Sequence, residues 1–248
     1  MEPQRLQAER GWQWIKQGYA LFMKAPLLWI VLLIICFVAA ALLSAIPVVG
    51  DILSSLLMPA VVAGLMTGCR AVEKDDELEL AHLLSGFRQR TSQLVTLGGI
   101  SLVAQLLILG VMMALGGATL VGILISGQPP QDPQVFAQAM AGAGFAIILG
   151  LVLFLIWMMA MQFAPLLVYF NNVAPVDALK LSLNAILANV RPMMVYGITL
   201  MLLAVLASLP MLLGWLVLLP IIFTSLYASY CDIFPAATEA AAETGTEA

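Results

Sequence analysis

Six long apolar runs, arranged in pairs, dominate the chain. They cover residues 26–48, 52–69, 94–126, 138–170, 192–209 and 215–231. A helix of about 20 residues crosses a bilayer core of about 30 Å, so each run has about the length of one transmembrane helix. Turn-forming segments separate the two runs of each pair, at residues 50–51, 126–134 and 210–214. The pattern predicts an all-α polytopic membrane protein whose six spans form three hairpins.

A segment with apolar residues at helical spacing precedes each hairpin. The first segment presents Ala8, Trp12, Ile15, Tyr19 and Phe22 on one face. The second opens with Asp76 and Glu79, which predict a capping box, and continues with Leu80, Leu83, Leu84 and Phe87. The third begins at Pro175, a residue suited to a first helical turn, and continues with Val176, Leu179, Leu183 and Ile186. We expect three amphipathic helices that lie along the cytoplasmic face.

The order of amphipathic helix, span, turn and returning span predicts an internal threefold repeat. Its units are residues 4–70, 76–170 and 175–233, within one transmembrane domain of residues 1–234. Pro59 precedes Arg70 by eleven residues, as Pro220 precedes Cys231, and Pro165 takes the corresponding place in the middle unit. Because proline is common in membrane helices, chance register is the alternative explanation. Residues 235–248 are expected to form a disordered acidic tail.

The positive charges all fall on one side of this zigzag topology. The ten cations are Arg5, Arg10, Lys16, Lys24, Arg70, Lys74, Arg88, Arg90, Lys180 and Arg191. Lys and Arg near the ends of spans resist translocation, so this side is expected to be cytoplasmic, with both termini there. A hydrophobic share of 62% and a charged share of 10% fit a membrane protein and not a soluble one. We expect a multi-pass protein of the bacterial inner (plasma) membrane.

The spans lack the groups that membrane chemistry usually needs. No Asp, Glu, Lys, Arg or His lies in the middle of a span, which disfavours ion-coupled transporters, proton pumps and intramembrane proteases. His82 is the only histidine, and Cys36, Cys69 and Cys231 have no ligand partners at metal-binding spacing. We therefore predict no catalytic, cofactor-binding or metal-binding residues, and a protein that is not an enzyme.

Two sets of residues remain as candidates for function. Gln105 and Gln162 are the polar side chains expected to lie deepest in the bundle, as interhelical hydrogen bonds or as the lining of a cavity. The candidate contacts to lipid headgroups are Lys24, Arg70, Arg88, Arg90, Lys180 and Arg191. Setting the topology alone would also explain these cations. Trp12, Trp14 and Trp29 are interpreted as anchors at the membrane interface.

Several segments together resemble a known family. They are residues 12–22 with Pro26 and Trp29, LLSGFR at 83–88, APVDALKLSLNAILANVRP at 174–192 and LYASYCDIF at 226–234. Over nearly the whole chain they resemble an uncharacterised family of six-span proteobacterial inner-membrane proteins. More loosely, the chain is similar to the membrane domain of glycerophosphodiester phosphodiesterases. The resemblance implies an Arg before Asp232, where this chain has Cys231, and this departure weakens any claim that an Arg and Asp pair at the end of the last span is essential.

Two functions follow as hypotheses. The first is a non-enzymatic scaffold or accessory factor in envelope or lipid homeostasis. The alternative is a transporter or flippase-like carrier of an amphipathic anionic substrate. A closed bundle would favour the scaffold, whereas a cavity reaching Gln105 or Gln162 would favour the carrier. The expected partners are membrane lipids, with another membrane protein or a second copy left open, and no nucleic acid.

Overall fold

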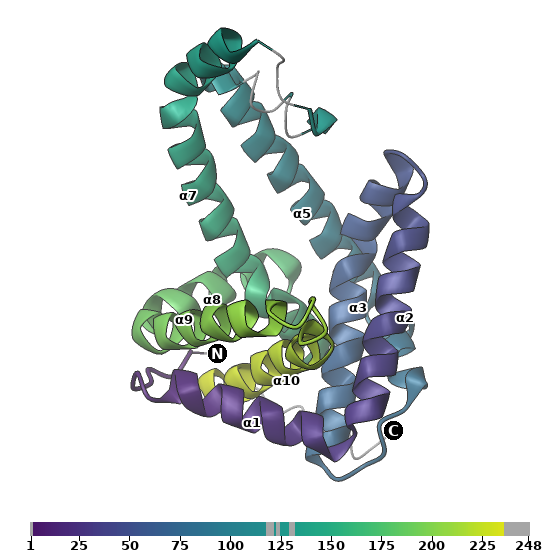
Figure 1. Cartoon of the computed structure of the whole chain (residues 1–248). Helices are drawn as coiled ribbons and strands as arrows, with labels where there is room; N and C mark the ends of the chain where they lie inside the picture. The colour runs from purple at the N-terminus through teal and green to yellow at the C-terminus, as the bar shows by residue number, and fades with distance from the viewer. Residues whose placement is uncertain (1, 118–121, 123–124, 129–131, 236–248) are drawn as a thin grey trace.

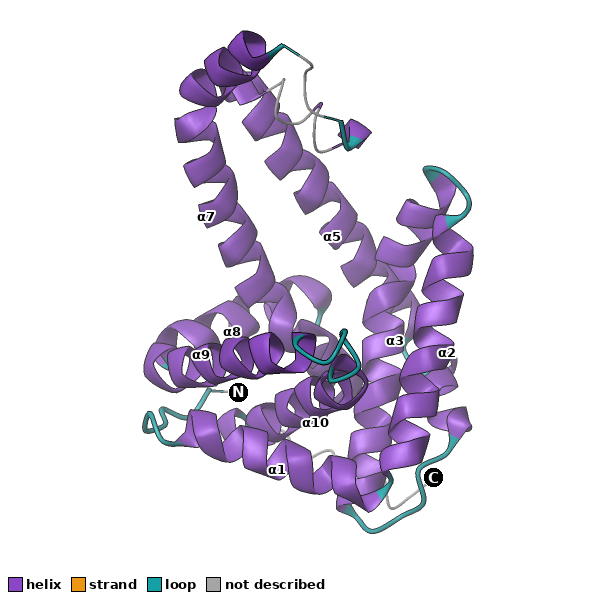
Figure 2. Cartoon of the chain, in the orientation of Figure 1, coloured by secondary structure: helices purple, strands orange, loops and turns teal. Residues whose placement is uncertain are grey.

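The described part of the chain is entirely helical in its regular structure. The computed structural model describes residues 2–117, 122, 125–128 and 132–235, and no strand occurs among them (Figure 2). The elements are α1 (Arg10–Lys24), α2 (Pro26–Ser44), α3 (Val49–Glu73), the 3₁₀ helix η1 (Leu80–Leu84), α4 (Ser85–Arg88), α5 (Thr91–Met112), the π-helical turn η2 (Met113–Gly117), α7 (Pro133–Asn171), α8 (Pro175–Ala188), α9 (Val190–Ser208) and α10 (Trp215–Ile233).

Six of the described helices are long and apolar enough to cross a membrane. They are α2, α3, α5 with the start of η2, α7, α9 and α10. They follow one another as the hairpins α2–α3, α5–α7 and α9–α10 (Figure 1). The predicted all-α polytopic fold is confirmed. Part of the turn predicted in the second hairpin, residues 129–131, lies outside the described residues.

The amphipathic helix α1 packs antiparallel along α10, and the backbones of the two helices approach each other closely. Arg10 lies beside Asp232 and Gly18 lies beside Ser225, where the Thr224 hydroxyl donates a hydrogen bond of 2.8 Å to the Gly18 carbonyl. A Cβ added to Gly18 would lie 2.6 Å from the Ser225 nitrogen, so only glycine permits this approach.

The buried face of α1 differs from the predicted one. Gly11, Trp14, Ile15, Gly18 and Phe22 are buried, whereas Trp12 and Tyr19 are about half exposed. The glycines decide the rotation of the helix because they let its backbone approach α10 and α9, and this contact outweighs the burial of two aromatic rings that lipid can solvate.

The second amphipathic segment is not one regular helix. It forms the 3₁₀ helix η1 and the single turn α4. Its capping box is made by Glu79 and His82, whose Nδ1 accepts a hydrogen bond of 3.0 Å from the Glu79 N–H, so the predicted pair of Asp76 and Glu79 is wrong. The segment lies against the small residues of α3: Gly86 faces Ala60, and Leu83 faces Gly64.

The third amphipathic helix, α8, inserts a hydroxyl into the backbone of α7. Ser182 is fully buried; its Oγ accepts a bond of 3.0 Å from the Phe163 N–H and donates one of 2.8 Å to the Met159 carbonyl. Those two groups would otherwise bond to each other in a regular α-helix. Pro165 lacks an N–H donor two residues later. Both features are recognised causes of helix bending.

The three amphipathic segments share one packing relation. The η1–α4 segment packs on α3, α8 packs on α7 and α1 packs on α10, so each lies on the returning span of the preceding hairpin in cyclic order. Pro59, Pro165 and Pro220 lie inside these three returning spans. A threefold repeat would produce this arrangement, and the division into three units stays a prediction. Most of the predicted tail, residues 236–248, lies outside the described residues.

The core lies where α3, α7 and α10 meet. Phe234 contacts Phe163 and Tyr230 edge-on or tilted, with ring centroids 6.0 and 5.6 Å apart, and the Arg70 guanidinium lies 5.5 Å from the Phe170 centroid. Trp14 and Trp29 are completely buried. The interpretation of these two as interface anchors is therefore wrong, because the helices α1 and α2 turn them toward the interior.

Candidate functional site

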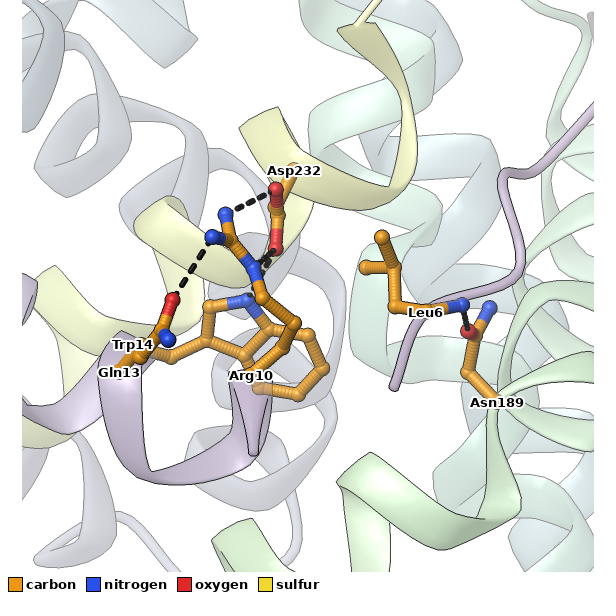
Figure 3. A network of polar contacts seen from close by, with 6 residues as sticks. All are labelled: Leu6, Arg10, Gln13, Trp14, Asn189 and Asp232. Carbon is orange, nitrogen blue, oxygen red and sulfur yellow. Dashed lines mark hydrogen bonds and ion pairs between the residues drawn. The ribbon is translucent and has the colours of Figure 1, made fainter. Parts of the chain in front are cut away.

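An ion pair joins the two ends of the chain. Arg10 on α1 donates from Nε to Asp232 Oδ2 over 2.7 Å, and its Nη2 makes a second bond to Oδ1 (Figure 3). Asp232 Oδ2 also accepts a bond of 2.8 Å from the indole N–H of Trp14. The hydrogen bond to Asp232 raises the pKa of Arg10 above its ordinary value, although partial burial opposes this. The pair fixes α1 on the end of α10.

A second link secures the N-terminal residues. Asn189, which is 1% exposed between α8 and α9, accepts a 2.8 Å bond from the Leu6 N–H and donates one of 2.8 Å to the Gln4 carbonyl. The Gln4 N–H donates to the Ile233 carbonyl over 2.9 Å. Figure 3 shows Asn189 and Leu6 next to the Arg10 cluster. The segment before α1 is thus bonded to the starts or ends of α8, α9 and α10.

Two tyrosines of α10 tie it to the ends of the other returning spans. The Tyr227 hydroxyl donates to Glu73 Oε2 at the end of α3 over 2.6 Å. The Tyr230 hydroxyl bonds Asn171 Oδ1 at the end of α7. Lys24, the last residue of α1, donates to the Val72 carbonyl over 3.0 Å and to Asp75 Oδ1 over 2.6 Å. All these bonds lie at the same end of the spans.

Two cavities lie in this polar end. One, of about 410 Å³, is bounded by α1, α10 and the end of α3; we call it the α1–α10 groove. It is lined by Arg10, Gln17, Ala20, Leu21, Lys24, Glu73, Tyr227, Ala228, Cys231 and Asp232. The other, of about 470 Å³, lies between the start of α2 and the segment after α3. Its lining residues are Lys24, Ala25, Leu28, Val72, Asp75, Asp76, Glu77 and Leu78.

Of the six predicted headgroup contacts, only Lys24 lines either of these cavities. Arg88, Arg90 and Arg191 are exposed on the surface. Lys180 is exposed and lies 3.7 Å from Asp177, and Arg70 lies over Phe170. Neither cavity brings Arg70, Arg88, Arg90 and Arg191 together, so their convergence on one headgroup stays a prediction.

The two glutamines do not line these cavities either. Gln105 is exposed and donates a bond of 3.0 Å to Ser101 on its own helix. Gln162 is partly buried, and its amide nitrogen lies 4.0 Å from the Met193 sulfur on α9. Gln105 is thus not the deeply buried group that its place in the sequence predicted, because its side of α5 faces outward.

Apart from Lys24, the residues that build the α1–α10 groove were not among the site residues predicted from the sequence, above all Arg10, Glu73, Tyr227 and Asp232. A signal existed: Gly11 and Gly18 are seven residues apart on the face of α1 that also bears Ile15 and Phe22. That spacing indicates a close helix partner. Asp232 finds its cation at the other end of the chain, so its neutralisation does not require an Arg at position 231. Among the described residues, no group of three or more His, Cys, Asp or Glu could hold a metal ion.

Comparisons with known proteins point to a membrane family. A family model described as a domain of unknown function (DUF7847) matches residues 11–246. A probable inner membrane protein of Burkholderia thailandensis is 30% identical over 195 residues, which cover 77% of this chain and 72% of the relative. No solved structure matches significantly. Neither match names a glycerophosphodiester phosphodiesterase, so that looser resemblance stays a prediction.

Proposed function

The chain belongs to the DUF7847 family and is a multi-pass inner-membrane protein, and from this premise we propose that it acts as a non-enzymatic scaffold or accessory factor in envelope or lipid homeostasis. Its partners would be membrane lipids and a second membrane protein or a second copy of the chain. The family description names no activity, so the proposal rests on how the polar groups and the apolar faces are distributed.

The main support for this proposal is that polar side chains form hydrogen bonds between different segments of the chain. Asp232, Tyr227 and Asn189 each bond to a residue of a different segment. These bonds connect α1, α3, α8 and α10 at one end of the spans. Neither of the two cavities reaches Gln105 or Gln162, the groups that a substrate pathway through the bundle was expected to use. The arrangement supports a rigid platform more than a carrier.

The apolar face of α9 supports a role in assembly. Met194, Ile198, Met201, Leu202 and Val205 are more than half exposed. Met194, Ile198, Met201 and Val205 are spaced by three or four residues and Leu202 lies beside them, which places the five on one stripe of the helix. Such a stripe contacts lipid acyl chains or an apolar helix of another protein.

Site-specific photocrosslinking from this stripe tests the proposal. A crosslinker at Met201, 71% exposed, should trap a protein partner of discrete mass in intact cells, whereas one at the buried Leu97 should not. Lipid adducts alone at Met201 would contradict a scaffold. Transfer of fluorescent lipid between leaflets of vesicles containing the purified protein would contradict it too, and would favour the carrier.

We place both termini in the cytoplasm. All ten Lys and Arg residues lie before the first span, in the connections between hairpins, or in the terminal turn of a span at that same end, as Arg70 in α3 and Arg191 in α9 do. Reporter fusions after the last residue and within residues 126–134 test this orientation. A C-terminal fusion active in the periplasm would overturn it.

A further inference from the structure

The α1–α10 groove lies at the level where spans begin and end. Lys24 is the last residue of α1 and lies two residues before the start of α2, Glu73 is the last residue of α3, and Asp232 lies one residue before the end of α10. A groove at this level faces the headgroup region of a bilayer. It also has apolar lining, from Ala20, Leu21 and other residues, that can contact the start of an acyl chain.

The polar side of the groove follows one face of α1. Arg10, Gln17 and Lys24 are spaced by seven residues, which places them in one row along the helix. This row differs from the buried row of Gly11, Trp14 and Gly18 that holds α1 to its neighbours. α1 therefore fastens itself with one row and presents the other to the groove.

Hydrogen-bond donors remain unused in that row. Arg10 has five N–H donors, and its three bonds use Nε, Nη1 and Nη2 once each, which leaves one donor on Nη1 and one on Nη2. The Gln17 side chain makes no hydrogen bond to any residue that the structure describes. These donors suit the oxygens of a phosphate group.

The charge of Glu73 is the least compensated in the groove. Asp232 is paired with Arg10, and Lys24 is paired with Asp75. Within the described part of the chain, Glu73 has only the neutral Tyr227 hydroxyl as its bonded partner. One carboxylate oxygen stays free for a cationic donor, and an ammonium group is such a donor.

We propose that the α1–α10 groove binds a phosphate ester bearing a primary ammonium group, such as the headgroup of phosphatidylethanolamine. The ammonium group donates to Glu73, and the phosphate oxygens accept from Arg10 and Gln17. A volume of about 410 Å³ lies within the usual range of small-molecule sites, about 300–1,000 Å³. The inference deepens the proposed function by naming the lipid, and it rests on that function for the placement of the groove at the membrane surface.

Native mass spectrometry of the full chain, released from nanodiscs of equal phosphatidylethanolamine and phosphatidylglycerol, tests this binding. The wild type should retain phosphatidylethanolamine selectively. Glu73→Gln should reduce the ratio of the two retained lipids by about tenfold, the effect of losing one charge-assisted contact. Glu9→Gln removes the same charge from the exposed residue that precedes α1, outside both cavities, and should leave the ratio unchanged. Glu73→Asp should restore most of the selectivity.

A competition experiment distinguishes binding of the headgroup alone from binding of the whole lipid. If soluble glycerophosphoethanolamine displaces the retained lipid, the headgroup alone is the ligand; if it does not, the acyl chains contribute. Both results support the site. Equal retention of both lipids by the wild type would overturn it. So would an unchanged ratio in Glu73→Gln protein whose melting temperature matches the wild type.

The lipid test and the crosslinking test fail independently. Loss of lipid selectivity with an intact Met201 crosslink would remove only this inference. Loss of the Met201 crosslink with selective lipid retention would remove the scaffold and leave the groove.

Discussion

The end of the molecule where α1, α3 and α10 meet differs in kind from the outer part of the α5–α7 hairpin. In α10, Thr224, Ser225 and Ser229 are buried. Thr224 and Ser225 contact Gly18 of α1, and the Ser229 hydroxyl donates to the Leu226 carbonyl of its own helix. In α7, Phe145 and Ile148 are 68% and 64% exposed. Figure 1 shows the far part of this hairpin extending away from the other helices.

The difference shows what holds helices together in lipid. Large apolar side chains gain little from leaving lipid for protein, so they do not by themselves drive helix association. Small residues that allow close backbone approach, together with interhelical hydrogen bonds, do so. The chain has both kinds of region. The end where α1, α3 and α10 meet is held by small residues and interhelical hydrogen bonds, whereas the outer part of the α5–α7 hairpin exposes large apolar side chains.

The sharpest test of this contrast uses two phenylalanines of the same helix. Phe163 is fully buried against Phe234, so Phe163→Ala should lower the free energy of unfolding by about 3 kcal/mol through the cavity it leaves. Phe145→Ala, on the exposed part of α7, should change it by less than about 0.5 kcal/mol. Reversible unfolding in mixed micelles measures both. Equal losses would mean that the outer hairpin is packed as tightly as the core.

The next test removes the carboxylate that anchors α1. Asp232→Ala leaves the Arg10 guanidinium and the Trp14 N–H without their acceptor and should cost about 2 kcal/mol, less than a fully buried pair because Arg10 is partly exposed. Asp76→Ala, at an exposed position, is the matched control and should be close to neutral. If both variants unfold alike, the ion pair does not stabilise the end of the bundle.

A smaller effect is expected from overfilling the contact between α1 and α10. Gly18→Ala places a Cβ 2.6 Å from the Ser225 backbone nitrogen and should cost about 1.5 kcal/mol as α1 moves away. Gly197→Ala adds the same atom in α9, where no atom lies within 4 Å, and should leave stability unchanged or raise it. A tolerated Gly18→Ala, seen as an unchanged melting temperature, would show that the backbones do not approach this closely.

The smallest effect concerns the hydroxyl between α8 and α7. Ser182→Ala removes the bonds to the Phe163 N–H and the Met159 carbonyl and should cost about 1 kcal/mol, in the range of interhelical bonds in membranes. Ser44→Ala removes an exposed hydroxyl bonded only within its own helix and serves as the control. If the two unfolding midpoints shift equally, Ser182 does not couple the helices.

The number, order and approximate bounds of the spans follow from the sequence alone. The bilayer imposes a length on every span, and that length appears directly as an apolar run. The run predicted at residues 26–48 corresponds to α2, Pro26–Ser44, and the run at residues 215–231 to α10, Trp215–Ile233. The family relation is also visible in local segments such as LYASYCDIF.

What only the tertiary structure decided is which faces meet. The apolar pattern of α1 favoured a face with Trp12 and Tyr19, yet the helix buries Trp14 and Gly18. Lipid can solvate the aromatic rings of Trp12 and Tyr19, so the apolar pattern does not decide which face of α1 is buried. The close approach of the helix backbones decides it. Arg10 and Asp232 are separated by 222 positions, and nothing local marks them as partners. The α1–α10 groove exists because the fold brings the first helix onto the last. The spacing of Gly11 and Gly18 indicates that α1 has a close helix partner, but it does not identify α10 as that partner.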